Sequence, residues 1–462
     1  MVERNNGILE RYTGPLSRRI QEEYAIGEEF YHGEVKKGLR NSDGTGVLAG
    51  VTKVGSVQGY LLQDGQRVPT PGRLYYRGIE LNDIVEAHRK AGTFGFEEVA
   101  YLLLMGFLPT KDELARFDRI MSQARKLPEG FTEGMIMRHP SENMMNELAR
   151  SVLSLYSYDP DPDDTSIANL LLQSVKLIGC FPSIVANSYA VKRHYFQGDS
   201  LHIHFPVPEL STAENFLRMI RPDTNYTEEE AHLLDMMLMV HAEHGGGNNS
   251  TFVCRAMSSS GTDTYSAIAG AVGSLKGPLH GGANAKVMEM FHYIKENVDP
   301  HDDGSIRDYL NKLLDKEAGD HSGKLYGLGH AVYTISDPRA VLLKKYAQHL
   351  AEVKGYAEDF VLLQKVEELG IPLVQERRHD DTPLCANVDM YSGLVYTMLG
   401  IPPDVFTPLF ASARIAGWCA NRMEELITCR RIMRPAYRAV TIHGHYIPME
   451  ERTAHLTDAP NV

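Results

Sequence analysis

Residues 96–104 read Phe-Glu-Glu-Val-Ala-Tyr-Leu-Leu-Leu, and this stretch decides the class of fold. Its apolar residues Phe96, Val99, Ala100 and Leu103 follow i, i+3, i+4, i+7 spacing, which is typical of the buried face of an α-helix. The Ser/Thr-x-x-Glu pattern of a capping box marks three further helix starts, at Thr110, Ser211 and Thr227. Because no β-α-β alternation follows Gly78, the sequence predicts a mostly α-helical protein.

The β-type residues lie earlier, between Gly46 and Arg77, where the pairs Asp64-Gly65 and Pro71-Gly72 are typical of turns. We therefore expect a small β-meander at about residues 46–77. The charged residues before about Val35 indicate a helical arm or a loose tail. Glycine-rich turns are candidate hinges, at 245–247, 277–282 and 327–329.

Net charge, cysteine content and the apolar segments exclude several classes of protein. The 462 residues carry a net charge of −13, which disfavours binding to nucleic acid or to an anionic membrane surface. Five cysteines without paired spacing indicate reduced thiols, and the acidic N-terminus does not resemble a transit peptide. The most membrane-like stretch, 167–191, is interrupted by Lys176 and Pro182 and predicts a buried helix pair. We expect a cytoplasmic protein.

His244 belongs to the first of four polar motifs, His241-Ala-Glu-His244-Gly245-Gly-Gly-Asn. Gly245 is a natural residue for the position just after a helix, which would place His244 in the last turn. A histidine there can simply complement the helix dipole. A metal site at His241 and His244 is the weaker reading because no third ligand has helical spacing, and we predict no metal.

His280 lies in the second motif, Gly277-Pro-Leu-His280-Gly281-Gly282-Ala-Asn. Glycines on both sides allow a ligand to approach the imidazole closely, so a site and a plain turn with an exposed histidine are about equally favoured.

The third motif is Lys324-Leu-Tyr-Gly327-Leu328-Gly329-His330, followed by Asp337-Pro338-Arg339. Without a third glycine and a preceding strand, it does not predict a dinucleotide fold. Asp337 and Pro338 are a good N-cap and first residue of a helix. Arg339 would then either bend into solvent or hold an anion together with the helix terminus.

The fourth motif is Asn387-Val-Asp389, in which Asn387 caps a helix that ends near Gly400. Taken alone, Asp389 in the first turn is explained by the helix dipole.

In order and context, these four motifs resemble the citrate synthase family, and the resemblance runs from about Gly38 to Pro435. It implies an all-α fold with a large domain, 1–280 and 396–462, and a small domain, 281–395. It further implies a catalytic trio of His280, His330 and Asp389. His244, Arg339 and Arg414 would bind the oxo-acid, oxaloacetate, while Arg434 would reach it from the partner subunit of a homodimer.

The resemblance also implies that coenzyme A, as the thioester co-substrate, contacts Lys324, Gly327, Leu328 and Gly329, with no permanently bound cofactor. The sequence departs from the family in places. Ala331 and Thr334 stand where many bacterial members carry Arg and Lys, Asn421 replaces a common His, and Cys385-Ala386 replaces Tyr-Pro.

The residue types make chemical sense for this reaction. A carboxylate base, Asp389, suits removal of a proton from a thioester methyl group. His280 and His330 suit donation to the enolate oxygen and to the ketone oxygen. Arginines suit a dicarboxylate. We therefore expect citrate formation from acetyl-CoA and oxaloacetate, at the start of the tricarboxylic acid cycle. The alternatives are 2-methylcitrate formation from propionyl-CoA and, more distantly, an inactive helical scaffold or metabolite sensor.

Overall fold

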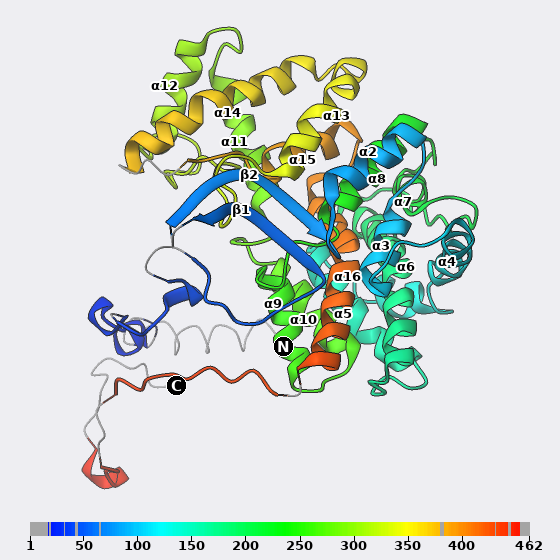
Figure 1. The fold of residues 1–462 in the computed structure, drawn as a ribbon, viewed down its shortest axis with the longest axis horizontal. Coiled ribbons are helices and arrows are strands. Elements are labelled where there is room, and N and C mark those ends of the chain that lie inside the picture. Colours follow the sequence, from blue (N-terminus) through cyan, green and yellow to red (C-terminus); the bar gives the residue numbers. More distant parts are fainter. Residues whose placement is uncertain are drawn as a thin grey trace. The chain divides into compact units, whose positions relative to one another are not determined.

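Helices make up most of this protein in the computed structural model, which describes residues 17, 20–31, 33–41, 45–63, 66–378, 383–429, 431–441 and 445–452 (Figure 1). The prediction of a mostly α-helical fold is confirmed. The α-helices of the described part are α2 Leu81–Ala91, α3 Phe96–Met105, α4 Lys111–Ala124, α5 Met144–Leu155, α6 Ile167–Lys192, α7 Thr212–Ile220, α8 Glu228–His241, α9 Asn249–Ser259, α10 Thr264–Leu275, α11 Ala283–Asn297, α12 Asp303–Leu314, α13 Pro338–Lys354, α14 Ala357–Arg378, α15 Asp389–Met398 and α16 Pro403–Thr428. Short 3₁₀ or π turns lie at Glu28–Tyr31, Lys37–Leu39, Thr132–Met137, Tyr156–Tyr158, Arg193–Gln197 and Met449–Glu451.

The predicted β-meander is a three-stranded antiparallel sheet in the order β1 Gly55–Gln63, β2 Gln66–Tyr76, β3 Ile79–Glu80. The predicted turn at Asp64-Gly65 lies outside the described residues. Pro71-Gly72 is not a turn, which corrects the prediction. It lies inside β2, where the register shifts opposite Gln58 and Tyr60. Proline has no N–H to donate to a regular ladder, but at an irregularity the pairing is interrupted and this donor is not needed.

The predicted helix starts are confirmed by their side-chain hydrogen bonds. Thr110, Ser211 and Thr227 each accept from the backbone N–H three residues on, and the glutamate there accepts from the backbone of the capping residue. These reciprocal bonds satisfy N–H groups that have no partner within the helix. The face of α3 predicted from its periodicity, which includes Phe96, Val99 and Leu103, is fully buried.

The long apolar segment is a single helix, α6, and not the predicted helix pair. Pro182 lies inside it without ending it. Among the described residues, the segment Ile167–Gln197 is long and apolar enough to cross a membrane, but 67% of its most apolar window is buried within the protein. It packs against α16, α4 and α7, as a core helix does.

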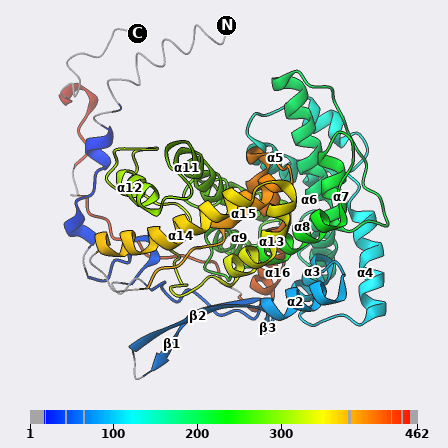
Figure 2. The same ribbon diagram turned by 90° about the horizontal axis from the view of Figure 1, so that it is seen from above.

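The chain divides into two compact units, one comprising residues 1–48 and 434–462 and the other residues 49–433. Within the second unit, helices α11 to α15 pack against one another, and Figures 1 and 2 show them grouped together. This group also contacts α8 and α16. The division into a small domain at 281–395 and a large domain stays a prediction.

Candidate active site

His244 lies beyond the end of α8 and not in its last turn, which corrects the prediction. The helix ends at His241, and Gly245 has a φ of 81°. The intervening segment is held against α16. The Gly417 N–H donates to the Ala242 carbonyl over 3.1 Å, and the Glu243 carboxylate accepts from the Gly245 N–H and from Asn421 Nδ2, over 2.5 and 2.9 Å. Burial, and after it the charge of Arg339, keeps the pKa of His244 well below its ordinary value.

His280 occupies the turn between α10 and α11. The turn closes through the Gly281 N–H, which donates to the Leu275 carbonyl over 3.0 Å. A Cβ at Gly281 would lie 2.2 Å from that oxygen, so only glycine fits. The Ser250 backbone N–H lies 3.3 Å from His280 Nε2. The Ser250 hydroxyl lies 3.0 Å from the same nitrogen. The backbone N–H can only donate and the hydroxyl can donate as well, so both contacts are satisfied when Nε2 accepts and the neutral ring carries its proton on Nδ1.

The opposite tautomer is set at His330. Its Nδ1 accepts from the backbone N–H groups of Val332 and Tyr333, over 3.0 and 3.1 Å, so the proton of the neutral ring lies on Nε2. The ring stacks on Tyr333, with centroids 4.5 Å apart, and meets the His244 ring edge-on at 5.1 Å. His244 and His330 are therefore neighbours, although 85 residues separate them.

Asp389 is brought to His330 by pairing of the two segments that carry them. The Gly329 N–H donates to the Cys385 carbonyl over 2.8 Å, and the Asn387 N–H donates to the Gly327 carbonyl over 2.9 Å. Asn387 Oδ1 also accepts from the Asp389 N–H over 3.0 Å, but the N-cap of α15 is Val388 and not Asn387, which corrects the prediction. Burial raises the pKa of Asp389 to about 6, against the opposing charges of Arg339 and Arg414.

Arg339 does not bend into solvent, so the first of its two predicted alternatives is wrong. The second, that it holds an anion together with the helix terminus, stays a prediction. Asp337 and Pro338 are the N-cap and first residue of α13, as predicted. The Arg339 side chain is buried and donates to the Asp337 carboxylate through Nε and Nη2, over 3.0 and 2.7 Å. A fork-to-fork pair of this kind fixes the orientation of the guanidinium. Asp337 also accepts from the Val388 N–H over 3.2 Å and so joins the starts of α13 and α15.

Arg414 lies in the middle of α16 and is completely buried. Its Nε donates to the His241 carbonyl over 2.6 Å, but neither Nη nitrogen has a hydrogen-bond partner among the described residues. Burial lowers the pKa of Arg414 to about 10, so the group remains a cation at neutral pH. A buried cation with two unused donors is suited to bind an anion.

The positive charge of Arg414 shifts the pKa values of three other candidate residues. It contributes to the low pKa of His244 and to that of His280, which burial lowers to about 4, and it acts on Asp389 as well. Because His330 contacts His244, the structure gathers around Arg414 six of the residues singled out from the sequence: His244, His280, His330, Arg339, Asp389 and Arg414 itself.

The role of Arg434 at the oxo-acid site stays a prediction. Arg434 lies in the other compact unit of the chain, and its side chain is exposed. Of the predicted coenzyme A contacts, Gly327 and Gly329 adopt φ values of 84° and 95°, which glycine allows. Leu328 forms a β-bridge with Ala386. Their predicted role, like that of Lys324, stays a prediction.

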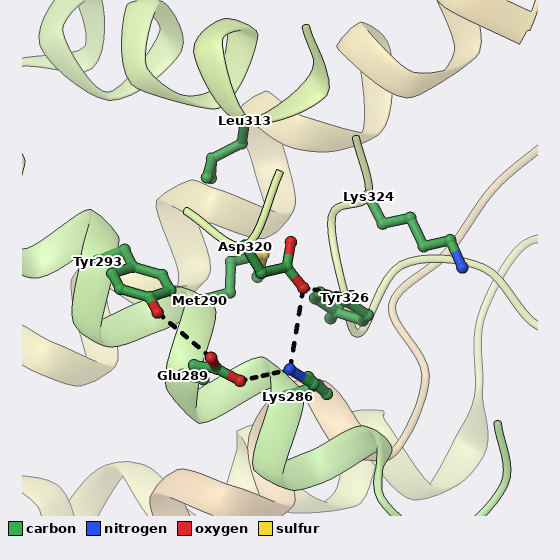
Figure 3. Close-up of a pocket in the computed structure, with 8 residues that line it drawn as sticks. All are labelled: Lys286, Glu289, Met290, Tyr293, Leu313, Asp320, Lys324 and Tyr326. Carbon is green, nitrogen blue, oxygen red and sulfur yellow. Dashed lines mark hydrogen bonds and ion pairs between the residues drawn. The ribbon is translucent and has the colours of Figure 1, made fainter. Parts of the chain in front are cut away.

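Lys324 lines a small pocket between α11 and α12 (Figure 3). In that pocket Lys286 pairs with Glu289 over 2.7 Å, and the Tyr326 hydroxyl donates to Asp320 over 2.6 Å. Figure 3 shows the Lys324 ammonium directed away from these groups. None of the three catalytic candidates lines this pocket.

Two residues near the cluster received no role from the sequence. Tyr333 is 1% exposed and stacks on His330, and its hydroxyl has no partner among the described residues. Glu243 is fully buried, and its charge is the largest influence that favours the charged form of Arg414. Only their nearness in sequence to His330 and His244 could have signalled them.

Known proteins resemble this chain over most of its length. The family model described as citrate synthase, C-terminal domain, matches residues 43–436. A citrate synthase of Deinococcus radiodurans is 36% identical over 383 residues, 82% of this chain and 93% of that protein. A 2-methylcitrate synthase of Shewanella oneidensis is 32% identical over 366 residues, 79% of this chain and 87% of that protein.

The fold agrees with this result. The citrate synthase of Thermoplasma acidophilum, solved as a ternary complex with carboxymethyl coenzyme A and oxaloacetate, superposes with a TM-score of 0.74 at 26% identity. That match covers 91% of this chain and 100% of the other. The matching family model, the relatives above 30% identity and the shared fold together show that this chain belongs to the citrate synthase family.

Proposed function

We propose that this protein condenses acetyl-CoA with oxaloacetate and water to form citrate and coenzyme A. The observation that carries the proposal is the buried Arg414: its two Nη nitrogens have no hydrogen-bond partner in the described part of the chain, and its charge acts on the pKa values of Asp389, His280 and His244. A dicarboxylate supplies the anion that such a site requires, and the neighbouring groups supply a base and two donors. A tricarboxylic acid cycle role follows from this reaction.

Asp389 acts as the base. Its carboxylate removes a proton from the methyl carbon next to the thioester, and the electron pair of that C–H bond moves into an enolate. A pKa of about 6 leaves the carboxylate ionised at neutral pH, yet makes it a stronger base than an exposed aspartate. Removal from water, which raises this pKa, also strengthens its interaction with the developing charges.

His280 stabilises the enolate. Its Nδ1–H is the free donor because Nε2 is occupied by the Ser250 N–H. With a pKa of about 4, the ring donates as a neutral imidazole and not as an imidazolium. A donor held at the oxygen where negative charge develops lowers the barrier to its formation.

His330 acts on the second substrate. The enolate carbon attacks the ketone carbon of oxaloacetate and forms a C–C bond, while the C=O electron pair moves to the ketone oxygen, which takes a proton from His330 Nε2. The proton that Asp389 removed then returns to His330, so both groups regain their starting states. The product is a citryl thioester, and water then cleaves its C–S bond to release citrate and coenzyme A. Arg414 and the part of Arg339 not engaged by Asp337 bind the carboxylates of oxaloacetate, with His244 as a further donor.

We further propose that the functional unit is a cytoplasmic homodimer in which Arg434 of one subunit completes the oxo-acid site of the other. The five cysteines are all free, which suits a reducing compartment. The proposed coenzyme A contacts are Lys324, Gly327, Leu328 and Gly329, which precede His330 directly.

A second candidate is 2-methylcitrate formation from propionyl-CoA, which the 32% identical 2-methylcitrate synthase favours. One assay separates the two candidates: release of the coenzyme A thiol from each acyl-CoA in the presence and absence of oxaloacetate. We expect oxaloacetate-dependent release with a higher kcat/KM for acetyl-CoA. A higher value for propionyl-CoA would replace our proposal with the second candidate, and no release from either would leave a scaffold or sensor.

A further inference from the structure

Glu230 forms a buried ionic junction near the start of α8, away from the candidate active site. Its side chain is 3% exposed. Its carboxylate accepts from both terminal nitrogens of Arg221, over 2.9 and 3.1 Å, and from Lys354 Nζ over 2.6 Å. It also accepts from the Thr227 N–H over 2.8 Å, as part of the capping box.

Glu230, Lys354 and Arg221 each connect the junction to one helix, and at or just beyond the other end of that helix lies a residue of the candidate site. We call the contacts of Glu230 with Lys354 and with Arg221 the Lys354 arm and the Arg221 arm. Glu230 lies in the first turn of α8, which leads to His244. Lys354 is the last residue of α13, whose second residue is Arg339. Arg221 also donates to the carbonyl of Leu399, the C-cap of α15, whose first residue is Asp389.

The three helices α8, α13 and α15 pack against one another through α13, so we expect a shift at the junction to move the site ends of these helices. Helix α13 contacts both α8 and α15, and the two ribbon views show the three close together (Figures 1 and 2). The 17 residues of α13 span about 25 Å at 1.5 Å per residue. A small rotation about the junction would therefore displace Arg339 relative to His244, and catalytic geometry tolerates only about 0.5 Å of such displacement.

The Glu230 carboxylate is ionised at neutral pH. Burial opposes ionisation of Glu230, but the hydrogen bonds from Arg221 and Lys354 outweigh it and lower the pKa to about 2. By contrast, Lys345, on the same helix α13, forms a pair with Glu86 in which both side chains are about half exposed. An exposed pair of this kind holds a helix weakly, whereas loss of one partner of a buried pair is costly.

We infer that Glu230 is a positioning residue for the condensation: with Lys354 and Arg221 it holds together the far ends of α8, which leads to His244, and of α13 and α15, which carry Arg339 and Asp389. This inference rests on the proposed function. It assigns separate effects to the two arms. The Lys354 arm sets the position of Arg339 and thus oxaloacetate binding, and the Arg221 arm sets the position of Asp389 and thus proton removal.

The test compares Lys354→Met, Arg221→Lys and the control Lys345→Met, all assayed where thermal unfolding shows the variant to be folded. Oxaloacetate affinity is measured by titration calorimetry, and kcat by thiol release. We expect Lys354→Met to weaken oxaloacetate binding about tenfold and to lower kcat/KM by up to about 10²-fold, the size of effect that a misplacement of about 1 Å produces. Arg221→Lys should lower kcat more than it weakens oxaloacetate binding. Lys345→Met should stay within about twofold of wild type.

Lys354→Arg, which keeps a cation at the junction, should recover most of the lost affinity. The inference would be overturned if Lys354→Met and Arg221→Lys lowered the melting temperature but kept the oxaloacetate affinity and the kcat that the Lys345→Met control shows. If Lys354→Met did not fold, an unchanged kcat in Arg221→Lys would by itself overturn the inference. If the wild type released no thiol from either acyl-CoA, the proposed function would fail, while calorimetry with oxaloacetate would still test the Lys354 arm.

Discussion

His280 and His330, the two histidines proposed as catalytic, accept backbone hydrogen bonds on opposite ring nitrogens. The Ser250 N–H occupies Nε2 of His280, and the Val332 and Tyr333 N–H groups occupy Nδ1 of His330. In the neutral form of each ring, the other nitrogen therefore carries the proton. Backbone donors cannot reverse their role, so these tautomers are fixed by the fold before substrate arrives.

Replacing either histidine should remove a donor from a developing negative charge. We expect His280→Ala and His330→Ala each to lower kcat on the order of 10²–10³-fold. His330→Ala should in addition weaken oxaloacetate binding, because its target oxygen belongs to that substrate. His292→Ala is the matched control, since His292 is exposed and paired with Glu296 on α11. An effect of His330→Ala alone would make His280 structural and refute the proposed enolate donor.

Asp389→Asn should abolish the base without disturbing the oxo-acid site. We expect kcat to fall by about 10²–10⁴-fold, while calorimetry finds oxaloacetate affinity nearly unchanged. In the wild type, kcat/KM should decline as the pH falls below about 6, because protonation removes the base. Full turnover in the variant would return Asp389 to a helix-dipole role.

Asp389→Asn should make the folded protein more stable at neutral pH, although it lowers activity. The pKa of Asp389 is raised in the folded state from 3.8 to about 6. Its stabilising contribution is therefore present below about pH 4 and lost as the pH rises through about 6. At neutral pH the wild type carries a cost of at most about 3 kcal/mol that asparagine avoids. Asp389→Asn should melt at a higher temperature than wild type above pH 6, and a pH-independent difference would contradict this reasoning.

At the scale of elements, the β-hairpin supports the loop that follows His330. The Gly72 N–H in β2 donates to the Ser336 carbonyl over 3.1 Å, and a Cβ at Gly72 would lie 2.1 Å from that oxygen. On β1, a Cβ at Gly59 would lie 2.4 Å from the Val332 carbonyl oxygen. The loop between His330 and Arg339 therefore rests directly on two strand glycines.

Gly72→Ala should push this loop away from the hairpin. We expect a loss of about 1–3 kcal/mol in the free energy of unfolding from overpacking, together with a lower kcat/KM because His330 moves with its loop. Gly50→Ala is the control, since no atom lies within 4 Å of a Cβ built at Gly50. Denaturant unfolding and the thiol-release assay measure both effects, and wild-type behaviour of Gly72→Ala would show that the loop does not depend on the hairpin.

For the whole molecule, a shared site predicts complementation between inactive subunits. Arg434→Gln and Asp389→Asn should each be nearly inactive alone. Random pairing makes about half of the dimers mixed, and each mixed dimer has one intact site, so about a quarter of wild-type activity per site should return. Co-expression of His280→Ala with Asp389→Asn is the control. Both damaged groups belong to the same subunit's cluster, so no site is repaired. No recovery with Arg434→Gln, in dimers proven mixed by mass spectrometry, would refute the shared site.

Features encoded by neighbouring residues could be predicted from the sequence. The helix starts at Thr110, Ser211 and Thr227 each depend on a hydrogen bond between residues three apart, so the local pattern suffices. The periodicity of α3 likewise revealed its buried face. His280, His330 and Asp389 were found because their short motifs occur in a family-like order, and the family is confirmed.

Features that depend on distant packing were decided only by the tertiary structure. The α8 helix ends before His244, where the following segment bonds to α16. Pro71-Gly72 reads as a turn but lies in a strand, at an irregularity that fits the loop carrying Ser336. Glu230 reads as half of a capping box, yet it also accepts from Lys354 of α13, 124 positions away, and is linked through Arg221 to Leu399 at the end of α15. Local sequence sets which conformations a segment favours, but burial and long-range hydrogen bonds determine which charges meet, because those energies depend on neighbours that only the folded chain supplies.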